Sequence, residues 1–243
     1  MNGEVTALSK LKLEANAGGK ALALARLIQA GFNVPAGFIV NGDPKDPNLR
    51  QDILEHFDKL KTSRVAVRSS AASEDGARDA WAGQLDSYLN VSREELIEKI
   101  ALCQKLAGSE RAKSYAKQKG LRAGHISVIV QKMITSATAG VAFSIHPVSG
   151  QTGQMVIEAV AGLGEKLVAG SITPDTYVID KKSAKTIEAH TAGRPVLTDE
   201  MLTNLSQTIK KVEVFFGHPV DVEWAISDGR LYILQSRPIT AIG

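Results

Sequence analysis

The last part of the sequence contains the feature that most constrains the fold, an Asp228-Gly229 dipeptide between two strand-like runs, residues 220–226 and 230–235. Asp-Gly pairs favour the positive φ angles of a two-residue β-hairpin turn. The two runs are therefore predicted to be neighbouring antiparallel strands. Any fold assigned to this chain has to contain an antiparallel sheet that includes this hairpin.

Helix and strand signals are mixed through the rest of the chain. Apolar periodicity predicts helices over residues 19–30, 52–61, 93–107, 110–119 and 198–216, the last with Thr198 as its N-cap. Short apolar runs predict strands over residues 38–40, 64–68, 126–130, 141–145, 155–160, 177–180 and 186–189. Residues 41–48 and 71–84 are predicted to be loops. Because helices and strands do not alternate regularly as in a doubly wound fold, the α+β class is favoured.

Composition limits the kinds of partner. The net charge is +3 and the Lys and Arg residues are scattered, whereas a nucleic-acid binder concentrates them on one face. No apolar run is long enough to span a membrane, and the first dozen residues lack the apolar core of a secretion signal. The single cysteine, Cys103, is expected to be a buried apolar thiol. We therefore expect a cytoplasmic protein with no nucleic-acid or membrane partner.

Gly18-Gly19-Lys20 opens the helix that is predicted over residues 19–30. Glycines at a helix start let backbone N–H groups approach a phosphate, and the lysine adds a full positive charge. The segment is not a Walker A loop, because Glu14 stands where that motif has its first glycine and Ala21 follows the lysine. The alternative is an ordinary helix start with an exposed lysine.

A second basic position ends the strand predicted over residues 64–68. Arg68-Ser69-Ser70 suits an oxyanion, because a guanidinium makes bidentate contacts and hydroxyl groups complete the shell. The alternative is an ion pair of Arg68 with Glu74 or Asp75. The loop that follows ends in Ala82-Gly83-Gln84, which either covers a phosphate as a flap or forms an ordinary turn.

The closing hairpin carries polar side chains of another kind. Strand alternation places Asp221, Glu223 and Ala225 on one face of the first run. It likewise places Leu231, Ile233 and Gln235 on one face of the second run. The carboxylate of Glu223 and the amide oxygen of Gln235 suit Mg²⁺, which uses few protein ligands beside water and phosphate. Arg237 faces as Gln235 does and is suited to neutralise phosphate charge. The alternative is a solvated polar face.

Together these segments resemble the N-terminal nucleotide-binding domain shared by phosphoenolpyruvate synthase, pyruvate phosphate dikinase and rifampicin phosphotransferase. Each motif alone is weak, but they follow the family's order along the whole chain. The motifs are Gly18-Gly19-Lys20, Val34-Pro35-Ala36-Gly37-Phe38, Val67-Arg68-Ser69-Ser70-Ala71, Glu74-Asp75, Ala82-Gly83-Gln84, Leu89-Asn90-Val91, Val130-Gln131-Lys132-Met133, Gly140-Val141-Ala142-Phe143-Ser144, Gly162-Leu163-Gly164-Glu165, Pro174-Asp175-Thr176-Tyr177, Asp221-Val222-Glu223-Trp224 and Gln235-Ser236-Arg237-Pro238.

The resemblance implies an ATP-grasp fold, in which ATP is held between two α+β subdomains. We expect these subdomains at residues 1–125 and 126–243, forming together one nucleotide-binding module. The resemblance also implies that Lys20 and Arg68 contact phosphates and that the loop through Gly83 and Ser87 covers the triphosphate.

Three further roles are implied by the same resemblance. The backbone of Gln131-Lys132-Met133 is the hinge that meets adenine. Glu223 and Gln235 hold Mg²⁺, and Arg237 contacts the transferring phosphate.

In this family the phosphoryl group passes to a histidine on a swivelling domain. The present sequence has no Gly-Gly-x-Thr-x-His motif, and Trp81 and Ser87 stand where phenylalanine and threonine are expected. The prediction is therefore an ATP-dependent, dikinase-like phosphotransferase component whose partner is a phosphohistidine-bearing domain or protein. The alternatives are a regulatory module that binds ATP without turnover, and the nucleotide domain of a longer rifampicin-phosphotransferase-like enzyme.

Overall fold

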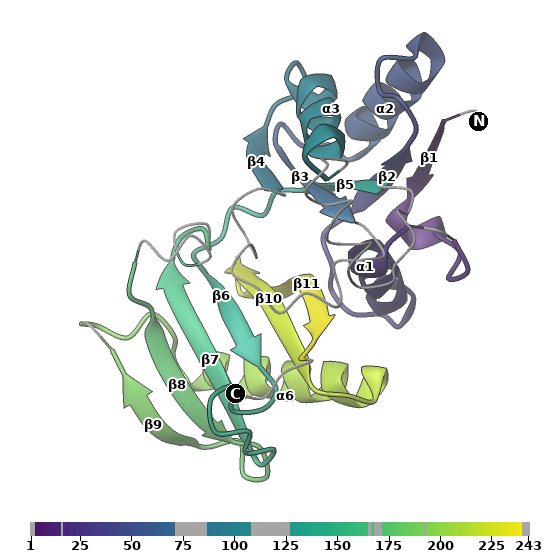
Figure 1. The fold of residues 1–243 in the computed structure, drawn as a ribbon. Coiled ribbons are helices and arrows are strands. Elements are labelled where there is room, and N and C mark those ends of the chain that lie inside the picture. Colours follow the sequence, from purple (N-terminus) through teal and green to yellow (C-terminus); the bar gives the residue numbers. More distant parts are fainter. Residues whose placement is uncertain are drawn as a thin grey trace. The chain divides into compact units, whose positions relative to one another are not determined.

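A computed structural model describes residues 3–15, 17–70, 87–107, 127–164, 167, 172–191 and 193–239. The chain divides into two compact units, Met1–Met133 and Ile134–Gly243 (Figure 1). The loop predicted over residues 71–84 and the helix predicted over residues 110–119 lie outside the described residues. Within the described ranges, no helix combines the length and apolar character needed to cross a membrane.

The first unit is built on a five-stranded antiparallel sheet with the strand order β1-β2-β5-β3-β4. Its strands are β1 Glu4–Ala7, β2 Gly37–Asn41, β3 Val65–Ser70, β4 Ser87–Val91 and β5 Ser127–Lys132. Its helices are the 3-10 helix η1 Leu8–Lys10 and the α-helices α1 Gly19–Gln29, α2 Pro47–Lys59 and α3 Leu96–Ala107. Of these strands, β1 and β4 were not predicted.

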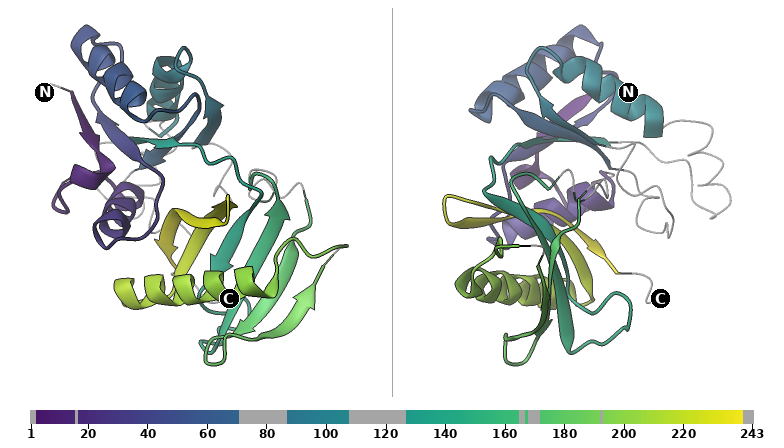
Figure 2. Two further views of the ribbon diagram at one scale, coloured as in Figure 1. Left: turned by 180° about the vertical axis from the view of Figure 1, so that it is seen from behind. Right: turned by 90° about the vertical axis from the view of Figure 1, so that its left-hand side faces the viewer.

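Helices cover both faces of this sheet (Figure 2). Alternation along β2 sends Phe38 and Val40 into a core with Ile53 of α2, whereas Ile39 packs with α1 on the opposite face. Cys103 of α3 is buried in the first of these cores, as predicted.

Helix α2 begins earlier than predicted, at Pro47 instead of residue 52. The Asp46 carboxylate accepts hydrogen bonds from the backbone N–H groups of Asn48 (3.0 Å) and Leu49 (3.1 Å), so Asp46 is the N-cap. Pro47 stands in the first turn, where a missing N–H costs nothing. The polar, proline-containing segment that predicted a loop therefore contains the start of a helix.

The boundary between the units also differs from the predicted one. Subdomains at 1–125 and 126–243 would assign β5 to the second unit. The structure instead pairs β5 with β2 on one side and with β3 on the other, and the first unit continues to Met133. The sequence indicated the strand, but its pairing partners lie far away along the chain.

The second unit is built on a six-stranded antiparallel sheet with the strand order β11-β10-β6-β7-β8-β9. The strands are β6 Thr138–Phe143, β7 Gln154–Ala161, β8 Asp175–Asp180, β9 Thr186–His190, β10 Val220–Ser227 and β11 Arg230–Pro238. Helix α6, Asp199–Phe216, lies along one face of this sheet (Figure 2).

Two local predictions in this unit are confirmed. Thr198 caps α6, since its hydroxyl accepts a hydrogen bond from the backbone N–H of Met201 at 3.3 Å. Asp228 and Gly229 form the hairpin turn with φ angles of 49° and 71°, the positive values that a tight β-hairpin requires.

Residues that pair across neighbouring strands form rows, and the burial of these rows distinguishes the two faces of the second sheet. Trp224 of β10 lies opposite Gly140 of β6, and this row is buried. A Cβ at Gly140 would lie 1.8 Å from the carbonyl oxygen of Glu158, so only glycine permits this close approach. The next row, Glu223, Val141 and Glu158, is partly exposed. Helix α6 therefore covers the Trp224 face, and Glu223 belongs to the open face.

A β-bulge in β11 decides which side chains share the open face. Trp224 pairs with Ile233 and Glu223 pairs with Gln235, so Leu234 is an extra residue between the two pairs. The extra residue shifts the alternation of side chains. The prediction that Ile233 and Gln235 share a face is therefore wrong, and the bulge is what places Gln235 beside Glu223.

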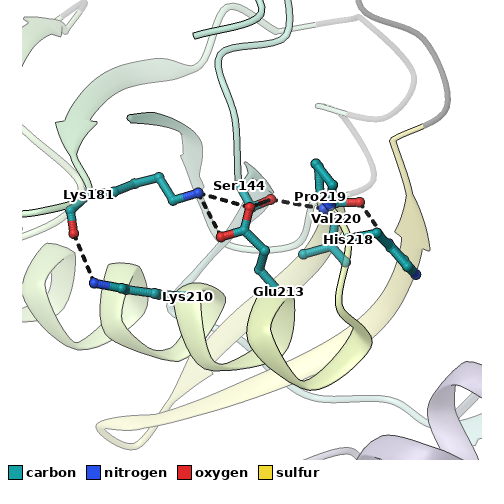
Figure 3. Close-up of polar contacts among 7 residues, drawn as sticks. All are labelled: Ser144, Lys181, Lys210, Glu213, His218, Pro219 and Val220. Carbon is teal, nitrogen blue, oxygen red and sulfur yellow. Dashed lines mark hydrogen bonds and ion pairs between the residues drawn. The ribbon is translucent and has the colours of Figure 1, made fainter. Parts of the chain in front are cut away.

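A polar network holds the start of β10 (Figure 3). Ser144 donates its N–H to the carbonyl of Val220, and its hydroxyl accepts the N–H of Val220, each at 2.9 Å. The same hydroxyl donates to the Glu213 carboxylate (2.9 Å), which also pairs with Lys181 (2.6 Å). The Lys181 and Glu213 side chains are only 14% and 18% exposed. The network thus ties the last turn of α6 and the β8–β9 connection to β10.

Candidate functional site

In the first unit, the structure brings the two predicted phosphate-binding motifs together. Lys20 lies in the first turn of α1, and the hydroxyl of Ser70 on β3 accepts a hydrogen bond from the backbone N–H of the next residue, Ala21, at 3.1 Å. Arg68 lies two residues before Ser70 and opposes Ile129, which packs with α1. Arg68 therefore shares the α1 face of the sheet with Ser70.

The predicted contact of Ser87 is also on this face. Ser87 opens β4 directly opposite Arg68, and opposed residues of antiparallel strands project from the same face. Its side chain is exposed, so its hydroxyl is accessible next to Arg68. Gly83, the other predicted residue of the covering loop, lies outside the described residues.

The predicted adenine hinge lies at the end of β5. The backbone N–H groups of Lys132 and Met133 donate to the carbonyls of Ala36 (2.8 Å) and Arg64 (3.1 Å), so both are engaged within the first unit. The side-chain amide nitrogen of Gln131 is buried and has no hydrogen-bond partner among the residues that the structure describes. A buried donor without a partner is costly, which makes this amide a candidate for a bound ligand or water.

In the second unit, the hairpin places two polar pairs side by side on the open face. Glu223 opposes Gln235, and Asp221 opposes Arg237. Both Nε and Nη2 of Arg237 lie 2.7 Å from Oδ2 of Asp221. The Asp221 side chain is 8% exposed and that of Arg237 is 49% exposed. Asp221 thus fixes one edge of a guanidinium that remains accessible.

Carboxylates on this face affect one another. Burial raises the pKa of Asp221, the Arg237 guanidinium lowers it, and the charge of Glu223 raises it. Burial also raises the pKa of Glu158, and the charge of Asp221 adds to that effect. Neighbouring negative charges that raise the pKa of Asp221 and of Glu158 favour a nearby cation.

Glu158 was not singled out from the sequence. It lies in the same cross-strand row as Glu223, with Val141 between them. The available signal was that it is the one charged residue in the apolar run 155–160. Asp221 was placed on the correct face, but its ion pair with Arg237 was not expected.

Glu223 and Gln235 fit the ligand set predicted for Mg²⁺, because they present a carboxylate and an amide oxygen at opposed positions. In the part of the chain that the structure describes, no group of three or more His, Cys, Asp and Glu residues could hold a metal. Mg²⁺ does not need such a group, since it retains several waters and phosphate oxygens as ligands.

The fold belongs to the ATP-grasp class. The solved structure of D-alanyl-alanine synthetase A from Vibrio cholerae matches 93% of this chain and 56% of its own length, with a TM-score of 0.50 and 11% sequence identity. An identity this low shows the fold alone. The predicted α+β class and ATP-grasp fold are confirmed.

The chain belongs to the pyruvate phosphate dikinase, AMP/ATP-binding domain family, which matches residues 42–193 and 184–243. It is 43% identical over 204 residues to a probable phosphoenolpyruvate synthase from Archaeoglobus fulgidus, covering 73% of this chain and 27% of the relative. It is 34% identical over 279 residues to an uncharacterized phosphotransferase from Bacillus subtilis, covering 93% of this chain and 34% of the relative. The chain thus spans about a quarter to a third of these relatives' length. The resemblance inferred from the motifs is confirmed, and the chain is an ATP-binding module of dikinase type.

Proposed function

We propose that this module binds Mg²⁺ and ATP and transfers a phosphoryl group to a histidine on a separate domain or protein. The observation that carries the proposal is the hairpin, where Glu223 opposes Gln235 and Asp221 opposes Arg237 in a chain of this family. Two oxygen donors for a cation thus lie next to an accessible guanidinium. Phosphoryl transfer requires such positioning and charge neutralisation more than covalent participation by the protein.

In this proposal Glu223 and Gln235 hold Mg²⁺, and Arg237 contacts the transferring phosphate. When bound, the metal neutralises charge on the phosphate oxygens and orients them. Asp221 keeps the Arg237 guanidinium in place through its two contacts of 2.7 Å. The negative charge of Glu158 on the same face adds to the attraction for the cation.

The cations of the first unit contact the other phosphates. Lys20 and Arg68 supply two positive charges. They lie on α1 and β3, which the hydrogen bond from Ala21 to Ser70 joins. Ser87, opposite Arg68, and Gly83 belong to the segment that covers the triphosphate.

In this proposal adenine is bound at the end of β5, and the hydrogen bonds already made there support a particular choice of contacting groups. Because the N–H groups of Lys132 and Met133 already donate to protein carbonyls, the donor to the base is the buried side-chain amide of Gln131. The backbone carbonyls of Gln131, Lys132 and Met133 are the corresponding acceptors. In this proposal the two units act as one nucleotide-binding module. The ATP substrate and the single, buried cysteine fit a cytoplasmic protein.

The test is to incubate the chain with Mg²⁺ and radiolabelled ATP, with and without a histidine-bearing swivelling domain of this family. We expect label on the partner's histidine that is lost in acid and kept in base. The chain alone should hydrolyse ATP slowly, because water is not held where an imidazole would be positioned for attack. Fast hydrolysis by the chain alone, or label on one of its own five histidines, would contradict the proposal. ATP binding without transfer to any such domain would instead support a regulatory module.

A further inference from the structure

The hydroxyl of Ser70 makes a contact that no motif predicted. It accepts a buried hydrogen bond from the backbone N–H of Ala21, 49 residues earlier in the chain, at 3.1 Å. Ser70 is 0% exposed and is the last residue of β3. The bond therefore joins the end of a strand to the first turn of a helix from a distant part of the sequence.

The bond replaces a helix cap. The first backbone N–H groups of a helix have no partner within the helix, and a side chain at the N-cap usually accepts one of them. The N-cap of α1 is Gly18, which has no side chain to do so. Ser70 supplies that acceptor from the neighbouring strand.

The same contact explains why Gly18 is a glycine. Its φ angle is 77°, in the left-handed region that other residues avoid. A Cβ at this position would lie 2.5 Å from the carbonyl carbon, the carbonyl oxygen and the hydroxyl oxygen of Ser70. The glycine loop therefore packs directly on Ser70. This packing and the hydrogen bond both fix the position of the start of α1 against β3.

The position of this bond relates it to the two cations. Ala21 follows Lys20 directly, and Ser70 lies two residues after Arg68 on the same face of β3. We infer that Ser70 is a positioning residue for the triphosphate, which holds the start of α1 against β3 so that Lys20 and Arg68 reach the same phosphate groups. This inference rests on the proposed function, because it assumes that both cations contact phosphate.

A positioning role makes a prediction that a purely structural role does not. Removing the hydroxyl should weaken the binding of ATP, whose outer phosphates need both cations, more than the binding of AMP, which lacks those phosphates. A general loss of folded protein would lower the active fraction for both nucleotides and leave each dissociation constant unchanged.

The matched control is Ser127→Ala. Ser127 is also 0% exposed and lies opposite Ser70 in the sheet, but its hydroxyl donates to the Asn41 side chain at 2.5 Å. The Ser127→Ala substitution removes a buried hydroxyl from the same end of the sheet and leaves the hydrogen bond between Ser70 and Ala21 intact.

The experiment is calorimetric titration of wild type, Ser70→Ala and Ser127→Ala with ATP and Mg²⁺, and separately with AMP. For Ser70→Ala we expect ATP to bind about 2- to 12-fold more weakly, the range that corresponds to one hydrogen bond, while AMP changes less than about 2-fold. Ser127→Ala should bind both nucleotides as wild type does. If Ser70→Ala does not fold, Ser70→Cys gives the same test, because its sulfur is a weaker acceptor of similar size.

Equal loss of ATP and AMP affinity in Ser70→Ala, or no loss of either, would overturn the inference. Lys20→Ala and Arg68→Ala, titrated in parallel, separate this result from a failure of the proposed function. If both weaken ATP binding while Ser70→Ala does not, only the positioning role is lost. If neither weakens it, the proposed phosphate contacts fail and the inference fails with them.

Discussion

The cations of the first unit and the carboxylates of the second are held in place in different ways. Lys20 and Arg68 lie on a helix and a strand that are joined by a side-chain hydrogen bond between residues 49 positions apart. Asp221 and Arg237 are only 16 residues apart and lie on paired strands of one hairpin. The first arrangement depends on a tertiary contact, whereas the second depends mainly on backbone pairing.

This difference indicates which substitutions should disturb the geometry of each region. In the hairpin, backbone hydrogen bonds and the Asp228-Gly229 turn set the register, so single changes on the open face should alter chemistry more than geometry. At the start of α1, the Ser70 hydroxyl and the close packing of Gly18 help to set the geometry, so small changes there should alter how the charges are placed.

Trp224→Ala should disrupt the hairpin from its buried face. Trp224 is 0% exposed, and replacing a buried tryptophan by alanine costs about 3–5 kcal/mol of the free energy of unfolding. Chemical denaturation with a probe in the second unit measures the loss. The control is Ile187→Ala on β9, where the side chain is 56% exposed and we expect a change within about 0.5 kcal/mol. A Trp224→Ala protein as stable as wild type would show that the buried face does not support the hairpin.

Glu223→Gln should abolish most magnesium-dependent phosphoryl transfer while leaving the hairpin folded. It removes the proposed anionic ligand and preserves the shape of the side chain. Because a metal ion contributes several kcal/mol to stabilising transition-state charge, we expect a loss of at least about 100-fold in rate. Transfer rates measured across a magnesium titration provide the test. An unchanged rate and an unchanged magnesium dependence would exclude Glu223 as a ligand.

Lys20→Ala and Arg68→Ala should each weaken ATP binding about 10- to 100-fold, because a hydrogen bond to a charged group contributes about 1.5–3 kcal/mol. Calorimetry measures the dissociation constants. Lys59→Ala, which removes an exposed cation from the last turn of α2, is the control and should bind ATP as wild type does. Wild-type affinity in both site variants would remove these residues from the phosphate contacts.

Glu158→Gln should stabilise the protein slightly at neutral pH. The folded-state pKa of Glu158 is raised by burial and by the charge of Asp221, so ionisation of Glu158 costs the folded state free energy. The wild-type protein is relieved of this cost below the unfolded pKa of about 4.3 and bears it fully once the pH has risen through the folded-state pKa.

The expected gain at pH 7 is within about 0.5 kcal/mol and should vanish below about pH 4. Denaturation curves at several pH values measure it, with the exposed Glu14→Gln as control. A loss of stability at neutral pH would show that the Glu158 carboxylate is stabilised in the folded protein.

The sequence predicted the local features of this molecule well. The turn at Asp228-Gly229 and the cap at Thr198 each depend only on residues within a few positions of that site, and both are confirmed. The sequence also placed Glu223 and Gln235 near one another on the same sheet. It did not predict the bulge at Leu234 that makes them paired residues, because nothing in the residue types marks an extra residue in a strand.

Features that depend on distant residues were missed. The membership of β5 in the first sheet depends on pairing with β2 and β3, which no local pattern encodes. The role of Ser70 as acceptor for Ala21 and the place of Glu158 in the Glu223 row likewise arise only when strands and helices from separate parts of the chain meet.

Our proposal assigns ATP phosphate contacts to Lys20 and Arg68 and magnesium ligation to Glu223 and Gln235. It is tested most directly by calorimetric titration of ATP, with and without Mg²⁺, into wild type, Lys20→Ala and Glu223→Gln. We predict one binding site in each protein, weaker binding in Lys20→Ala with the enhancement by Mg²⁺ retained, and loss of that enhancement in Glu223→Gln. Wild-type ATP affinity in Lys20→Ala together with undiminished enhancement by Mg²⁺ in Glu223→Gln would contradict the claim.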